Sequence, residues 1–244
     1  MTLTDATNDP TALLVGERVK ICAVREEDFA PWASWFNSGR ITAFLDHGEF
    51  PNSEADQRQF YASARASGRF LGMVRSIATD ALLGVISLSE INRVRRSAQL
   101  SIVVPSKCES APLAALEAQA LVTEHALTRM GLDRLWSGHA YPGLERWARR
   151  TELIGWYPDG HAHRAFVHGH AISDIIMTSA LRHNVDRLRE RRAGSLWCGT
   201  ERMLRMINDA DFVTTPSGAK LIADAVHATV DERWALIERV EARC

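Results

Sequence analysis

The chain lacks a long hydrophobic run, and no stretch approaches the ~20 apolar residues that a membrane-spanning helix requires. The opening residues, MTLTDATNDP, are polar and acidic, without the basic start and apolar centre of a signal peptide. The four cysteines are far apart and form no CxxC pair, which argues against common zinc and redox motifs and against a disulfide framework. We therefore expect a soluble, cytoplasmic protein.

An excess of charge is also lacking. The 29 Lys and Arg residues nearly balance the 30 Asp and Glu residues, giving a formal net charge of −1. Such a balance creates no global field that recruits nucleic acid or an anionic membrane. Two short basic segments, RVRRS (93–97) and RWARR (146–150), have no accompanying aromatic platform. We expect neither a nucleic-acid partner nor a membrane partner.

The 244 residues, 46% of them apolar, suffice for one large domain with a buried core or for a domain with an appendage. We expect a flexible tail over residues 1–12, an α/β domain over 13–182 and a helical extension over 183–244. The extension combines charged helical patterns with Gly- and Pro-containing breaks. It would cap the domain or mediate self-association as a homodimer.

The order of periodic segments predicts the architecture of the domain. ERVKICAV (17–24) alternates like a half-buried strand, and the segment from 113 to 130, rich in Ala, Leu and Glu, predicts a long helix ended by Gly131. A mixed, mostly antiparallel sheet with helices on both faces fits this order best. The other expected elements are helices over 25–38, 53–67 and 143–154, and strands over 69–77, 81–91, 97–105, 132–140 and, as a pair, 164–181.

Five segments spread over about 165 residues carry a family resemblance. They are GERVKICAVREEDFAPWASWFNS, LLGVISLSEIN, AQLSIVV, EAQALVTEHALTRMGLDRLWS, and ELIGWYPDG with the later AISDIIMTSAL. Their order and spacing resemble the GNAT family of acyl-CoA-dependent N-acyltransferases. The branch they resemble most includes ribosomal-protein N-terminal acetyltransferases and amino-sugar acetyltransferases. The resemblance implies acetyl-CoA as co-substrate and a primary amine as acceptor.

The resemblance places the CoA pyrophosphate at the stretch CESAPLAA (108–115), where the family has a Gly-x-Gly loop opening a helix. Here Leu113 and Ala115 occupy the glycine positions, and Ser110 takes that of the opening basic or amide residue. Side chains forced to positive φ there would cost ~1–2 kcal/mol each. A helix capped by Ser110, with Pro112 in its first turn, is the simpler interpretation. The implied cofactor-binding residues are Val103, Val104, Ser110, Ala111, Leu113, Ala114, Ala115 and Arg149.

The family's catalytic tyrosine is also replaced. Leu144 and Thr151 stand where the family often has an asparagine and the tyrosine that protonates the CoA thiolate. We expect Tyr141 to substitute as this acid, although Tyr157 lies nearby and water can also protonate a thiolate. Glu90, at the end of a strand that faces the cleft in the family, is the candidate general base.

Two polar segments are candidates for binding the acceptor. His47 and Glu49 lie in the turn LDHGEFPNS, and His168 lies in the arm HAHRAFVHGH. This arm carries four histidines at alternating spacing, which a hairpin would bring together as zinc ligands. No cysteine or carboxylate accompanies His161, His163, His168 and His170 at a familiar spacing, so we expect no metal there.

Two functions remain in competition. The first is transfer of an acetyl group from CoA to an amino sugar, often nucleotide-linked, or to a protein N-terminus. The second is a catalytically degenerate GNAT fold that binds a ligand or a protein. The missing glycines favour the second, and the polar residues of the cleft favour the first.

Overall fold

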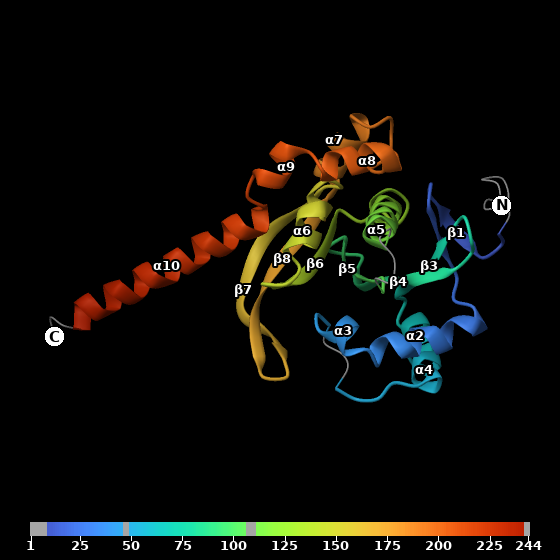
Figure 1. Cartoon of the computed structure of the whole chain (residues 1–244), viewed down its shortest axis with the longest axis horizontal. Coiled ribbons are helices and arrows are strands. Elements are labelled where there is room, and N and C mark those ends of the chain that lie inside the picture. Colours follow the sequence, from blue (N-terminus) through green and yellow to red (C-terminus); the bar gives the residue numbers. More distant parts are fainter. Residues whose placement is uncertain (1–8, 46–48, 106–110, 242–244) are drawn as a thin grey trace.

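The computed structural model describes residues 9–45, 49–105 and 111–241, and within them the strands form one eight-stranded sheet (Figure 1). The strand order is β1-β2-β3-β4-β5-β6-β8-β7, and only β5 and β6 pair in parallel. The expected mixed, mostly antiparallel sheet is confirmed. The strands are β1 (Ala12–Val15), β2 (Val19–Cys22), β3 (Phe70–Ser76), β4 (Leu82–Asn92), β5 (Ser97–Val103), β6 (Arg134–Tyr141), β7 (Trp156–His168) and β8 (Ala171–Leu181).

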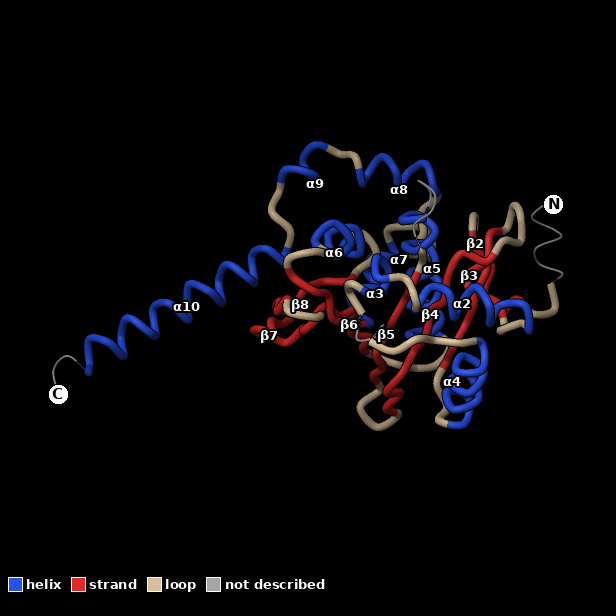
Figure 2. Tube along the Cα trace, turned by 60° about the horizontal axis from the view of Figure 1, so that its bottom comes forward, coloured by secondary structure: helices blue, strands red, loops and turns tan. Residues whose placement is uncertain are grey.

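Helices cover both faces of the sheet (Figures 1 and 2). The long central helix α5, with α7 and α8 beyond it, lies on one face, and α2, α3 and α4 lie on the other. None of the described helices is long and apolar enough to cross a membrane. After a 3-10 turn η1 (Glu26–Asp28), the helices are α2 (Phe29–Phe36), α3 (Gly39–Thr42), α4 (Glu54–Ala66), α5 (Ala111–Thr128), α6 (Glu145–Glu152), α7 (Arg182–Glu190), α8 (Thr200–Ile207), α9 (Ala210–Thr214) and α10 (Gly218–Glu241).

The strand period of two residues divides the buried side chains between two cores. Val74 and Ile86 face the larger core beneath α5, whereas their neighbours Met73 and Val85 face a smaller core with the aromatic residues of α2. The sheet is thereby buried on both faces over its centre. This burial explains why the central strands are rich in Val, Ile and Leu.

Helix α5 is buried on nearly every side, as its Ala- and Leu-rich sequence predicts. The sheet lies on one side of it, and the chain after α7 covers the other, where Leu196 and Met203 are fully buried in the same core. The first part of the segment expected to be an extension therefore contributes to the domain core. Only α10 projects away from the body of the protein (Figure 1).

Strand β2 departs from the expected half-buried pattern, because all four of its residues are buried. Lys20 is only 2% exposed, and its Nζ lies 2.7 Å from Asp9 Oδ2 and 2.9 Å from Asp80 Oδ1. A buried ammonium is tolerated only when it is paired in this way. The alternation of polar and apolar residues would place Lys20 on the exposed side of the strand. The sequence did not indicate that Asp9 and Asp80 would pair with it.

Strands β1 and the first part of β7 were not expected. β1 is only four residues long and lies at the edge of the predicted tail. β7 begins at Trp156, and irregularities in its pairing with β8 interrupt the alternation that a sequence pattern relies on. Because of these irregularities, the sequence did not indicate that β7 begins as early as Trp156.

A buried carboxyl group joins α5 to the β1–β2 turn. Glu117 of α5 is fully buried and accepts hydrogen bonds from the backbone N–H groups of Glu17, at 2.5 Å, and Arg18, at 3.1 Å. A Cβ at Gly16 would collide with its carboxylate, so the turn requires glycine there. Burial raises the pKa of Glu117 to about 7, although these N–H groups oppose the shift.

This raised pKa predicts a pH-dependent stability. Between about pH 4.5 and pH 7 the folded protein keeps the Glu117 proton that the unfolded chain has released, so the free energy of unfolding falls as pH rises, by up to ~3 kcal/mol. We expect Glu117→Gln to flatten this dependence in urea titrations at several pH values. The exposed Glu201→Gln serves as control, and a slope unchanged in Glu117→Gln would contradict the assignment.

Candidate functional site

The centre of the sheet opens where β5 and β6 separate. The two strands pair only through residues 97–99 and 134–136, and beyond them β5 stays paired with β4 and β6 with β8. Residues 100–103 of β5 therefore present backbone N–H and C=O groups to the opening rather than to β6. Such groups require partners when they are buried, so a strand edge of this kind can receive an extended ligand.

Helix α5 begins at the wide end of this opening, beyond the carboxyl end of β5. Leu113 and Ala115, the residues in place of the family's glycines, lie inside the helix, and neither has a positive φ. Their side chains therefore carry no backbone strain. The first-turn N–H groups of Ala111, Leu113 and Ala114 have no partner within the helix, while Pro112 has no N–H to offer. Ser110, the expected cap, lies outside the described residues.

Val103 and Val104 lead from the opening toward α5. A Cβ at Gly84 of β4 would collide with the carbonyl oxygen of Val103 and crowd Val104. Gly84 thus lets the chain that leaves β5 pass close to β4. The structure brings Val103, Val104 and the first turn of α5 to the same end of the sheet, and their contact with a cofactor stays a prediction.

A large groove lies on the α4 face of the sheet, with a volume of about 1410 Å³. Its floor is formed by the starts of β5 and β6 and by β8, its wall by the end of α4, and its mouth by the β4–β5 turn. The floor is unusually polar for the middle of a sheet, because it includes Ser89 and Ser97 beside Trp136 and Met177. This groove reaches the point where β5 and β6 begin to separate.

Glu90 lines the mouth of this groove. It has a φ of +51° and lies where the pairing of β4 with β5 is irregular, between Ser89 and Asn92. The irregularity turns its exposed carboxylate out of the regular strand pattern. The structure therefore places Glu90 at a groove over the paired starts of β5 and β6, and its role as a general base stays a prediction.

Four arginines line the same groove, and Glu90 is the acidic residue among its lining residues. They come from the loop after α4, from the β4–β5 turn and from the start of β6, so the sequence did not show that they meet. The RVRRS turn was the signal available in the sequence. Arg134 lies 2.7 Å from Asp159 Oδ2, and Arg93 donates to the carbonyl of Met130, so the charges of Arg69 and Arg95 are the ones that favour an anionic ligand. The arginines are Arg69, Arg93, Arg95 and Arg134.

The segment that follows α3 covers the end of β6. Gly143 has a φ of +137°, and a Cβ there would collide with the ring of Phe44. This contact brings the predicted acceptor-covering segment toward the opening. Glu49 is exposed at its far end, while His47 lies outside the described residues. His168 is exposed at the tip of the β7–β8 hairpin and is not brought close to Glu90 by any described contact.

Tyr141 ends β6 and packs beside Ile176 of β8 and Ala219 and Ala223 of α10. It therefore lies on the sheet face that carries α6 and α10, half-buried. Thr151 is fully buried in α6, and its hydroxyl donates to the carbonyl of Ala148 at 2.8 Å. Thr151 is thus unable to take the role of the family's tyrosine, as expected.

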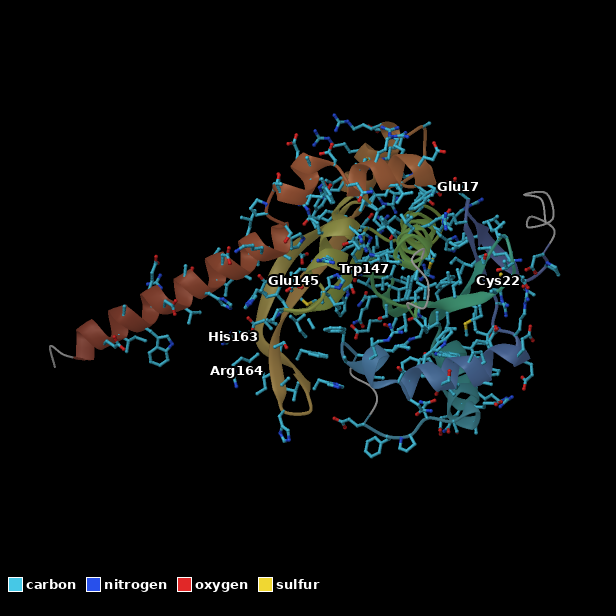
Figure 3. All side chains as sticks on the ribbon, viewed as in Figure 1. Glu17, Cys22, Glu145, Trp147, His163 and Arg164 are labelled. Carbon is cyan, nitrogen blue, oxygen red and sulfur yellow. The ribbon has the colours of Figure 1, made fainter. Side chains whose placement is uncertain are left out.

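Arg149 is engaged in holding α9. Its Nε donates to the carbonyl of Phe212 at 3.1 Å, its guanidinium lies 4.1 Å from the centre of the Phe212 ring, and its Nη1 lies 2.7 Å from Glu152 Oε2. On the same helix, Trp147 packs against the core around α5 (Figure 3). The contacts of Arg149 give it a structural role that competes with the predicted contact to CoA phosphates.

The variant Arg149→Met separates the two roles. It keeps the aliphatic stem but loses the hydrogen bonds, the ion pair and the contact with the aromatic ring, so we expect ~1–2 kcal/mol of lost stability, a fall in melting temperature of ~2–8 °C. Calorimetry should show CoA affinity within about twofold of the wild type. Arg146→Met, exposed on the same helix, is the control. A tenfold loss of affinity at unchanged melting temperature would instead support the cofactor role.

Comparisons with known proteins agree with this geometry. The sequence model described as "Acetyltransferase (GNAT) domain" matches residues 18–141, about half of the chain. No curated protein matches the chain. Similar solved structures include Mycobacterium smegmatis RimJ in complex with CoA-disulfide, at a TM-score of 0.61 and 16% identity, covering 74% of this chain and 91% of that one. Vibrio cholerae spermidine N-acetyltransferase in complex with CoA and spermine has a TM-score of 0.58 and 18% identity, covering 68% of this chain and 97% of that one. A GCN5-related N-acetyltransferase from Brucella melitensis has a TM-score of 0.61 and 18% identity, covering 77% of this chain and 86% of that one. With the opened sheet and the family match together, this chain belongs to the GNAT acetyltransferase family.

Proposed function

We propose that the chain transfers an acetyl group from acetyl-CoA to a primary amine. The observation that carries the proposal is the separation of β5 from β6, with α5 starting at its wide end. The opening connects the two faces of the sheet. A cofactor held on the α5 side can therefore meet an acceptor held in the groove on the α4 side.

The cofactor half uses backbone groups. The amides of the pantetheine arm of CoA would pair with the free edge of residues 100–103, as an added strand does. The pyrophosphate would lie at the free N–H groups that begin α5, where the helix dipole favours negative charge. The similar RimJ and spermidine N-acetyltransferase structures are complexes with CoA-containing ligands, which supports CoA as the ligand of this site.

The variant Leu113→Asp tests the pyrophosphate position. A carboxylate at the first turn of α5 would repel the phosphates by at least ~1.4 kcal/mol, so calorimetry should show CoA binding weakened tenfold or more. In the control variant Leu113→Asn, the neutral asparagine has nearly the shape of aspartate, so CoA affinity should stay within about threefold of the wild type. Equal affinities of both variants would refute this pyrophosphate position. Absence of any binding heat and thermal shift with the wild type at millimolar acetyl-CoA would refute the enzyme proposal.

The chemistry requires a neutral amine that attacks the thioester carbonyl. As the C–N bond forms and the C–S bond breaks, the nitrogen loses a proton and the CoA sulfur leaves as a thiolate. Glu90, directly or through a water, would accept the amine proton at the mouth of the groove. Tyr141, at the end of β6, would protonate the thiolate, a step that water also accomplishes.

The charge of the groove indicates the class of acceptor. Besides the ion-paired Arg134, three arginines face one glutamate in the groove, which favours an amine that also carries phosphate groups, such as a nucleotide-linked amino sugar. A polyamine, the ligand in the similar spermidine N-acetyltransferase structure, would be repelled by this groove. A protein N-terminus is the second choice, because it presents a primary amine without a defined anionic group.

Steady-state kinetics with matched acceptors tests this side of the site. We expect kcat/KM to be at least tenfold higher for an amino sugar carrying a nucleoside diphosphate than for the free amino sugar, and lowest for spermidine. Glu90→Gln should lower kcat at least tenfold while CoA affinity is kept, and the distant Glu201→Gln should change neither. Equal rates for the two sugars would contradict an anionic acceptor, and an unchanged kcat in Glu90→Gln would contradict its role as base.

Two further predictions belong to this proposal. The competing function, a non-catalytic GNAT fold, is favoured by the buried Thr151 in place of the acid. Turnover of acetyl-CoA in the kinetics above would exclude it, whereas CoA binding alone would not. Self-association through the C-terminal helices is supported by a stripe on α10, where Val230, Trp234 and Ile237 are exposed at helical spacing. Light scattering gives the molar mass in solution, and a monomer at all concentrations would exclude the homodimer.

A further inference from the structure

Three imidazoles surround one carboxylate on the side of the β7–β8 hairpin where α10 begins. His161 Nε2 of β7 and His227 Nε2 of α10 each lie 3.0 Å from Oδ2 of Asp174, which belongs to β8. His163 Nδ1 lies 3.1 Å from the other oxygen, Oδ1. Figure 3 shows His163 and Arg164 on the arm of the hairpin below the start of α10. Four residues from three elements thus converge on one point.

This set differs from the four histidines that the sequence brought into consideration. His161 pairs with Ile176, whereas His168 pairs with Ala171 at the hairpin tip, so the two histidines are ~20 Å apart along the strand. His170 lies in the turn beyond. The hairpin itself therefore does not gather its four imidazoles. Folding instead supplies a carboxylate from β8, the ligand type missing from the sequence pattern, and a further histidine from α10.

The geometry of the donor atoms suits a divalent metal ion. One atom each from His161, Asp174 and His227 lie within 4.8 Å of one another. In a tetrahedral zinc site with bonds of 2.0–2.1 Å, ligand atoms lie about 3.4 Å apart. The two nitrogen–oxygen distances of 3.0 Å require only a small outward movement of the rings. Imidazole and carboxylate are ligands that zinc accepts readily.

One of the three rings is buried. The His161 side chain is 1% exposed, and its Nδ1 has no hydrogen-bond partner in the described part of the chain. Its hydrogen bond to Asp174 therefore leaves the buried ring incompletely satisfied.

We propose that His161, Asp174 and His227 bind a zinc-type divalent cation, with the exposed His163 completing the coordination. The ion would replace the hydrogen bonds to Asp174 with metal–ligand bonds, and each neutral ring would then carry its proton on the nitrogen that does not face the ion. Because His227 lies on α10 and the other ligands on β7 and β8, the ion fastens α10 to the hairpin. The site is separate from the groove of Glu90 and requires no acetyl transfer.

Zinc titration of the full chain, produced without a polyhistidine tag and stripped with a chelator, tests the proposal. We expect one zinc ion per chain by calorimetry and by elemental analysis. Asp174→Asn and His227→Asn should each weaken binding at least tenfold. His168→Asn and His170→Asn, which remove imidazoles from the same hairpin outside the cluster, should leave affinity within about twofold.

Hydrogen–deuterium exchange provides a second measurement that does not depend on affinity. Zinc should slow amide exchange in α10 around His227 in the wild type and in His168→Asn, but not in His227→Asn. His227 is 49% exposed, so its substitution leaves the fold intact even if Asp174→Asn does not. Absence of stoichiometric binding, or binding that persists in His227→Asn with α10 still protected, would overturn the proposal and leave a purely hydrogen-bonded cluster.

Discussion

Parallel pairing between β5 and β6 stops after three residues, and both halves of the candidate site are arranged around that interruption. Each strand keeps its other neighbour, so the sheet stays continuous while its centre opens. On one face the opening meets the start of α5, with its free N–H groups. On the other face it meets the polar floor of the groove. A fully paired sheet would have separated these two environments completely.

Helix α5 holds this arrangement in place from behind. Its buried Glu117 binds the β1–β2 turn, and Glu17 of that turn accepts hydrogen bonds from Trp197 and Thr200 of the chain that covers the helix. Leu196 completes the core on the same side. Segments from both ends of the described chain thus stabilise one helix, and the position of its first turn is fixed by contacts far from the cofactor.

Much of the fold was readable from the sequence because its signals are local. The Ala- and Leu-rich pattern of α5, the alternation in β4 and β5 and the family's order of elements all depend on neighbouring residues. The features that sequence reasoning missed depend on distant ones. Lys20 is buried because Asp9 and Asp80, 11 and 60 residues away, neutralise it. Likewise His227 meets Asp174 across 53 residues, and the arginines of the groove come from three elements. The missing glycines of the phosphate loop had a local explanation, since Leu113 and Ala115 simply lie in a helix.

Helix α10 has a mechanical consequence. Its 24 residues span ~36 Å, yet its described contacts with the body of the protein involve mainly its first three turns, through Ala219, Ala223 and His227. It therefore acts as a lever with its fulcrum at the hairpin. Beyond His227 its last 14 residues extend ~21 Å, so a tilt of about 10° at that point moves the far end by ~4 Å. Tyr141 packs against Ala219 and Ala223 at the same place. A tilt of α10 would therefore also shift the residues that contact the end of β6.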